Sequence, residues 1–122
     1  MTVEELNNHN IAPNDTQLNN LKDLALKISE LENLFGKPFT VTSGLRDKAL
    51  QNKINPNVSN SAHLAGQAVD LLDVTGELWV FLMDHIDVLI KLGLYLESRT
   101  YTPRWCHLQS RVPRSQNRIF IP

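Results

Sequence analysis

The feature that most constrains the fold is an apolar pattern with helical spacing over residues 18–35. Apolar residues recur there at intervals of three or four, which predicts an amphipathic helix of about five turns. Asn14, with Gln17 three residues later, is typical of a capping box at the start of a helix, and Gly36 with Pro38 marks its end. The chain is therefore expected to contain one long helix with a single apolar face.

Further elements follow this helix. A short helix is expected over 46–54, and a second long helix from Thr75 to about Leu92, whose apolar positions predict that it is well buried. Strands are expected at 38–43, 68–74, 92–98 and 104–110, and a last edge strand at 118–122. Because helices and strands do not alternate regularly, we predict an α+β fold with two main helices and a small, mostly antiparallel sheet.

The chain length fits one domain over 1–122, with a polar lead at 1–13. No apolar stretch approaches the ~18 residues of a membrane span, so we expect no membrane contact. The acidic N-terminus does not resemble a secretory signal, so we expect synthesis in the cytoplasm. We also expect a monomer. Cys106 is the only cysteine, which excludes an internal disulfide and a cysteine-rich zinc module. Any metal must be held by histidine and carboxylate.

Charge is distributed unevenly. Residues 1–97 hold thirteen acidic residues against seven Lys and Arg, whereas 98–122 hold five arginines and no acid. These arginines are Arg99, Arg104, Arg111, Arg114 and Arg118. Such a segment could contact an anionic partner, but the arginines are spaced apart without interleaved aromatic residues, which favours solvated side chains over a nucleic-acid surface.

Chemistry-bearing residues gather in two segments. The segment 61–70, SAHLAGQAVD, holds His63 and Asp70, and a hairpin of 92–98 with 104–110 about a turn near Thr102 places Glu97 opposite His107. Strand alternation sends Trp105, His107 and Gln109 to one face, and Cys106 and Leu108 to the other. His63, Asp70 and His107 would provide three zinc ligands with a fourth position open, and a nearby carboxylate could move protons.

The sequence resembles the D-alanyl-D-alanine carboxypeptidase family of zinc peptidases. That family includes D-Ala-D-Ala dipeptidases and phage L-alanyl-D-glutamate endolysins, and shares its fold with the hedgehog signalling domain. The matching motifs are SGLR at 43–46, SAHLAGQAVDL at 61–71 and WCH at 105–107, in the order found in the family. The resemblance implies a Zn²⁺-dependent hydrolase acting on peptidoglycan stem peptides, with action at the cell wall after release.

The resemblance also implies roles for individual residues. His63, Asp70 and His107 would ligate zinc, and Arg46 would contact substrate. Many members carry an acid three residues before the last histidine, where this chain has Arg104; another branch, which includes short phage-like proteins, has a glutamate at the end of the preceding strand, as Glu97 is here. Glu97 is therefore the expected catalytic base.

Simpler interpretations remain for several of these residues. Glu97 could pair with Arg99 or Arg104, and Arg46 could pair with Asp47 or Glu32. Ser43 and Ser61 could bind substrate, or serve in caps and turns. Cys106 invites interpretation as a nucleophile, but the alternation points it away from His107 and favours core packing. The alternative function is a non-catalytic cell-wall-binding or phage assembly module with a structural zinc.

Overall fold

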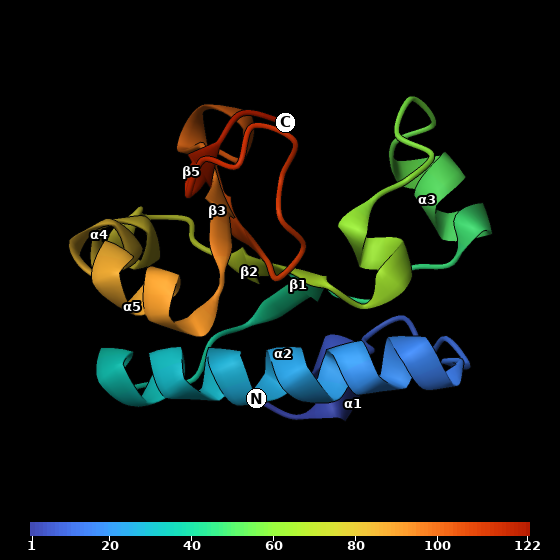
Figure 1. The fold of residues 1–122 in the computed structure, drawn as a ribbon, viewed down its shortest axis with the longest axis horizontal. Coiled ribbons are helices and arrows are strands. Elements are labelled where there is room, and N and C mark those ends of the chain that lie inside the picture. Colours follow the sequence, from blue (N-terminus) through green and yellow to red (C-terminus); the bar gives the residue numbers. More distant parts are fainter.

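The computed structural model describes all 122 residues and has an α+β fold, as the sequence predicts. The helices are α1 (Val3–Leu6), α2 (Asp15–Phe35), α3 (Lys48–Ile54), α4 (Glu77–Asp84) and α5 (Ile86–Leu92), with short 3-10 helices η1 (Ala62–Ala65) and η2 (Arg99–Tyr101). The strands are β1 (Val41–Ser43), β2 (Ala68–Leu72), β3 (Tyr95–Glu97), β4 (Trp105–Gln109) and β5 (Ile119–Phe120). Figure 1 shows α2 lying along one side of the sheet.

The long helix α2 has the predicted boundaries. The Asn14 side chain accepts from the backbone N–H of Gln17 and the Gln17 side chain accepts from that of Asn14, so the capping box is formed. Gly36 ends the helix in the left-handed conformation with φ 88°. Residues of the apolar face, including Leu21, Leu24, Ile28 and Leu31, are buried in the main hydrophobic core. Burial of this face is what fixes the helix against the sheet.

The sheet has the strand order β1-β2-β4-β3-β5. All neighbouring strands are antiparallel except β3 and β5, which are parallel. Strand β4 pairs with β2 on one side and β3 on the other, and Tyr95 lies opposite Gln109 in the register that the hairpin predicts. Strand β5 is an edge strand, also as predicted. The central position of β4 brings residues from both neighbouring strands next to His107.

The predicted second long helix is instead two helices. His85 separates α4 from α5, with φ −124° and ψ 37°. Its Nδ1 lies 2.7 Å from the Phe81 carbonyl oxygen, the group that an unbroken helix would give to the His85 backbone N–H, and that N–H bonds to Leu82 instead. The helices are also less buried than predicted, because Val80 and Ile90 are more than half exposed.

The N-terminal lead is more structured than its polar composition indicates. Thr2 and Glu5 form a capping box for α1, and Leu6 is fully buried in the core. The Asn8 side chain then accepts from the Gly44 N–H and donates to the Thr42 carbonyl. The N-terminal lead therefore fixes the backbone of residues 42–44 at the end of β1.

No helix in this structure has the length and the apolar character that crossing a membrane would require.

Candidate metal centre

Two of the candidate ligands are brought together by the pairing of β2 with β4. Asp70 and His107 are directly opposite each other in this register. The predicted alternation holds, because Trp105, His107 and Gln109 line a common cavity while Cys106 and Leu108 are fully buried in the core. The hairpin with β3 alone would have placed His107 beside Glu97, and the β2 pairing adds Asp70.

The third candidate ligand, His63, lies on the short helix η1. The Ser61 hydroxyl caps this helix by accepting from the His63 N–H, and Gly66 ends it in the left-handed conformation. A Cβ on Gly66 would lie 2.9 Å from the Gln17 carbonyl oxygen, so α2 packs tightly here. The Gln17 side chain donates to the Leu64 carbonyl. The capped start of α2 therefore supports the segment that carries His63.

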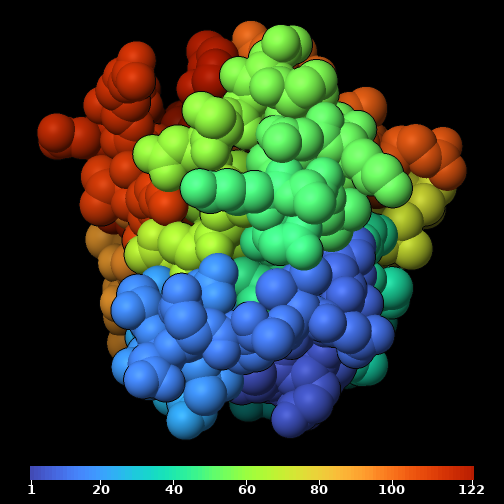
Figure 2. Space-filling view, turned by 90° about the vertical axis from the view of Figure 1, so that its right-hand side faces the viewer, coloured from blue at the N-terminus to red at the C-terminus, as the bar shows by residue number.

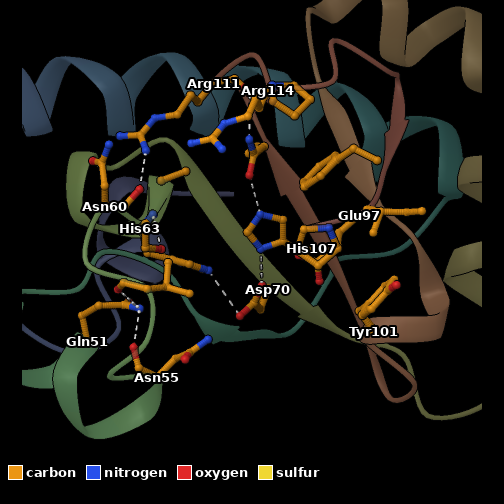
Figure 3. A pocket seen from close by; sticks show the side chains of 18 of the residues that line it. Gln51, Asn55, Asn60, His63, Asp70, Glu97, Tyr101, His107, Arg111 and Arg114 are labelled. Atoms are coloured by element: carbon orange, nitrogen blue, oxygen red, sulfur yellow. Dashed lines mark hydrogen bonds and ion pairs between the residues drawn. The ribbon is translucent and has the colours of Figure 1, made fainter.

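His63, Asp70 and His107 point toward one another (Figure 3), and one ligand atom from each lies within 4.8 Å of the others. His107 Nδ1 is 2.8 Å from Asp70 Oδ1, and His63 Nε2 is 3.4 Å from Asp70 Oδ2. The two imidazole rings are 5.1 Å apart between centroids. The three side chains that the sequence selects as ligands thus form one compact cluster, with His63 and Asp70 buried and His107 partly buried.

The outward nitrogens of both histidines are hydrogen-bonded to groups that can only accept. His63 Nδ1 donates to the Gly44 carbonyl at 2.8 Å. His107 Nε2 lies 2.7 Å from Gln109 Oε1, and Gln109 Nε2 donates to the Arg111 carbonyl, which fixes the orientation of the amide. In their neutral forms, both histidines therefore direct a lone pair inward, which is how second-shell acceptors orient histidine ligands.

Two lone pairs and a carboxylate facing one another bind either a proton or a metal cation. Burial acts to lower the pKa of His107, but the hydrogen bond and charge of Asp70 outweigh it and raise that pKa. Burial lowers the pKa of His63. Burial acts to raise the pKa of Asp70, but the neighbouring histidines bring it well below its ordinary value. Two imidazoles and one carboxylate are a suitable donor set for Zn²⁺.

Arg46 contacts the cluster from the SGLR segment. Its Nη2 lies 3.2 Å from Asp70 Oδ2, its Nε donates to the Ser43 hydroxyl and its Nη1 donates to Gln51 Oε1. A Cβ on Gly44 would lie 1.7 Å from the Leu6 carbonyl oxygen, so only glycine fits at position 44, where the SGLR segment packs against the backbone of Leu6. Arg46 pairs with neither of the carboxylates that the simpler interpretation named.

Glu97 lies at the end of β3 and lines the same cavity as the cluster. It pairs with neither Arg99 nor Arg104, since Arg99 pairs with Asp73 and no ion pair includes Glu97. Burial raises its pKa, and the positive charge of His107 partly offsets that effect. A raised pKa brings a carboxyl group closer to the range in which it can both accept and donate a proton.

The cluster opens into a cavity of about 730 Å³. Ser61 lines this cavity, whereas Ser43 does not; its hydroxyl instead bonds to Arg46 and lies 3.0 Å from His9 Nε2. The sequence predicts no place in this cavity for Gln51, Tyr101, Arg111 or Arg114, which all line it; Arg111 and Arg114 are expected to be solvated. Gln109 also lines the cavity, with no role predicted beyond its strand face. For Gln109, its place two residues after His107 on the same strand face was the available signal.

Cys106 belongs to the core and not to the cavity. It is fully buried, and burial together with the charge of Asp73 raises the pKa of its thiol to about 12. A thiol that stays protonated is a poor nucleophile. The packing interpretation of Cys106 is therefore favoured over the nucleophilic one.

The family model described as Peptidase M15 matches residues 1–93 of this chain. The match includes Arg46, His63 and Asp70, and ends before Glu97 and His107. The searches among curated proteins and among solved structures give no match.

Proposed function

The chain belongs to the peptidase M15 family, and from this premise we propose that it is a zinc peptidase that hydrolyses bonds in peptidoglycan stem peptides. We propose that the bond cleaved is either the D-Ala-D-Ala bond, as in the carboxypeptidases, or the L-Ala-D-Glu bond, as in the endopeptidases. The observation that carries the proposal is the convergence of His63, Asp70 and His107 at the floor of a cavity that also contains Glu97.

We assign zinc ligation to His63 Nε2, His107 Nδ1 and a carboxylate oxygen of Asp70. Gly44 and Gln109 hold the two imidazoles in the tautomers that such ligation needs. Zinc bound at such a site supplies a Lewis acid that polarises the scissile carbonyl and lowers the pKa of water. The opening of the cluster into the cavity leaves room for substrate beside the three ligands.

Glu97 is the proposed general base. It accepts the proton from the attacking water and delivers it to the leaving amine, which requires one group to act in both protonation states. Arg46 is the proposed contact to the carbonyl oxygen of the substrate. Its guanidinium has five N–H donors, and the three bonds to Ser43, Gln51 and Asp70 leave two of them for an oxygen on which negative charge develops.

The test combines metal analysis with product analysis. Purified protein should contain one zinc per chain, and His63→Ala or His107→Ala should lose it. Mass spectrometry of muropeptides after digestion should show the fragments of one bond type, which names the bond. A Glu97→Gln variant should retain zinc and lose hydrolysis; full activity in that variant would remove Glu97 from the mechanism.

A structural zinc in a non-catalytic cell-wall or phage assembly module is the competing function. It predicts the same zinc content and the same loss of zinc in His63→Ala, but no cleavage of any stem peptide. Arg104, which occupies the position of the acid in many family members, is exposed and does not line the cavity. The presence of Glu97 in the cavity favours the peptidase over this module.

A further inference from the structure

The five arginines of the C-terminal segment have different environments. Arg99 pairs with Asp73, and Arg118 lies over the Tyr95 ring and donates to the Leu94 carbonyl. Arg104 is exposed on the surface outside the cavity. Arg111 and Arg114 differ from these three, because both line the cavity that contains the candidate metal centre.

Neither cavity arginine is neutralised by an acid. Arg111 Nε donates to Gln67 Oε1 and its Nη1 donates to the Asn60 carbonyl, both uncharged acceptors. None of the seven ion pairs in the molecule includes Arg111 or Arg114. The acidic side chains that line the cavity are those of Asp70, which is engaged by Arg46 and the histidines, and Glu97. The two guanidinium groups therefore line the cavity without an acidic side chain to neutralise their charge.

The segment that carries these arginines is fixed close to the metal centre. The Arg111 carbonyl accepts from Gln109, whose other amide atom accepts from His107. The Arg111 side chain crosses to the loop before η1, and Figure 2 shows the C-terminal segment (red) beside the green segment that includes this loop. In Figure 3, Arg111 and Arg114 lie above the His107 ring, whereas Glu97 and Tyr101 lie to its right. The cations thus occupy a different part of the cavity from the proposed base.

From these contacts we infer that Arg111 and Arg114 form a subsite for a carboxylate of the peptide substrate. This inference rests on the proposed function, because it takes the substrate to be a stem peptide. Guanidinium groups bind carboxylates through paired N–H donors, and Arg111 retains three of its five after the bonds to Gln67 and Asn60. The two bonds hold Arg111 in place before substrate arrives, while exposed Arg114 can adjust to the ligand.

The probe is the synthetic pentapeptide L-Ala-γ-D-Glu-L-Lys-D-Ala-D-Ala, which has two carboxylates, at the glutamate α-carbon and at the C-terminus. A second peptide carries amides at both positions. Binding is measured by titration calorimetry on the Glu97→Gln background, so that affinity is obtained without relying on turnover. Arg111→Gln and Arg114→Gln are compared with Arg104→Gln, which removes an exposed charge of the same segment outside the cavity.

We expect Arg111→Gln and Arg114→Gln each to weaken binding of the acid peptide by about tenfold, the value of one hydrogen bond to a charged group. Neither should change binding of the diamide, and Arg104→Gln should change neither. Two singly amidated peptides then identify which carboxylate is bound. Equal affinity for the acid and the diamide, or equal effects of Arg104→Gln and Arg114→Gln, would overturn the subsite.

The proposed function can fail independently of the subsite. If the wild-type protein cleaves no stem peptide but the acid peptide binds in an arginine-dependent way, the subsite stands and the peptidase does not. If the wild type cleaves the acid peptide and the diamide equally well, and Arg114→Gln leaves KM unchanged for both, the peptidase stands and the subsite does not.

Discussion

Asp70 and Asp73 lie three residues apart, are both more than 90% buried, and have opposite surroundings. Asp73 accepts from the backbone N–H groups of Leu78 and Trp79 at the start of α4, from Arg99 and from the Cys106 thiol. Asp70 faces one guanidinium nitrogen and two imidazole nitrogens, which carry lone pairs in the neutral histidines because the ring hydrogens then bond to Gly44 and Gln109. One carboxylate is surrounded by donors, and the other shares its site with lone pairs.

This difference distinguishes an acid whose contacts stabilise the fold, Asp73, from the acid that we propose as a zinc ligand, Asp70. Burial acts to raise the pKa of Asp73, but the backbone N–H groups and Arg99 outweigh it and lower that pKa. Asp73 is therefore a stable anion that ties β2, α4 and η2 together without any added cation. Asp70 reaches comparable satisfaction when a proton or a metal lies between it and the histidines.

The largest expected effect is that of Asp70→Asn on zinc. The amide is nearly the same size but supplies no negative charge, so we expect zinc affinity to fall by more than about 100-fold and hydrolysis to be lost. Competition with a chromogenic chelator measures the affinity. Asp73→Asn is the matched control and should retain stoichiometric zinc; equal zinc loss in both variants would remove the distinction between the two acids.

Asp73→Asn should instead reduce stability. Its amide nitrogen would face donors, which leaves part of the N–H groups and Arg99 unsatisfied, and we expect a loss of about 2 kcal/mol in the free energy of unfolding. Urea unfolding of the metal-free protein measures this loss. An unchanged midpoint would show that the contacts of Asp73 add nothing to the fold.

The contribution of Asp73 to the free energy of unfolding should also depend on pH in the acidic range. Because the folded-state pKa of Asp73 lies below its unfolded value of about 3.9, its contribution is fully present above that pH and is lost as pH falls through the folded pKa. The difference in unfolding free energy between wild type and Asp73→Asn should therefore stay constant from about pH 6 down to about pH 4 and narrow below about pH 4. Metal-free protein is used for both, since protonation of histidine would release zinc.

The sequence predicts the three candidate ligands that the fold brings together, but not the contacts that hold them in place. His63, Asp70 and His107 could be selected because their residue types, motifs and strand alternation are local properties, and the register with β3 follows from the hairpin. The β2–β4 pairing, the bond of His9 to Ser43 and the break at His85 depend on contacts between distant segments or on one side chain competing for a carbonyl. No periodicity in the sequence contains that information.

A smaller effect on zinc affinity is expected from Gln109, which contacts the Asp70 cluster through His107. Gln109→Met removes the acceptor that holds the His107 tautomer, and we expect zinc affinity to fall about 10- to 100-fold with little change in stability. Gln109→Glu keeps an acceptor toward His107 and should bind zinc more tightly than the methionine variant. Equal affinities in the two variants would show that the hydrogen bond does not orient the ligand.

The smallest expected effect is that of Cys106→Ala, on the Asp73 side. The variant removes a buried sulfur whose thiol lies 3.5 Å from Asp73, a long and weak contact, and leaves a small void in the core. We expect a loss of about 1 kcal/mol in unfolding free energy. Zinc content and hydrolysis should be unchanged, because the side chain points away from the cavity. Loss of hydrolysis with zinc retained would instead place the thiol in the chemistry and reopen the nucleophilic interpretation.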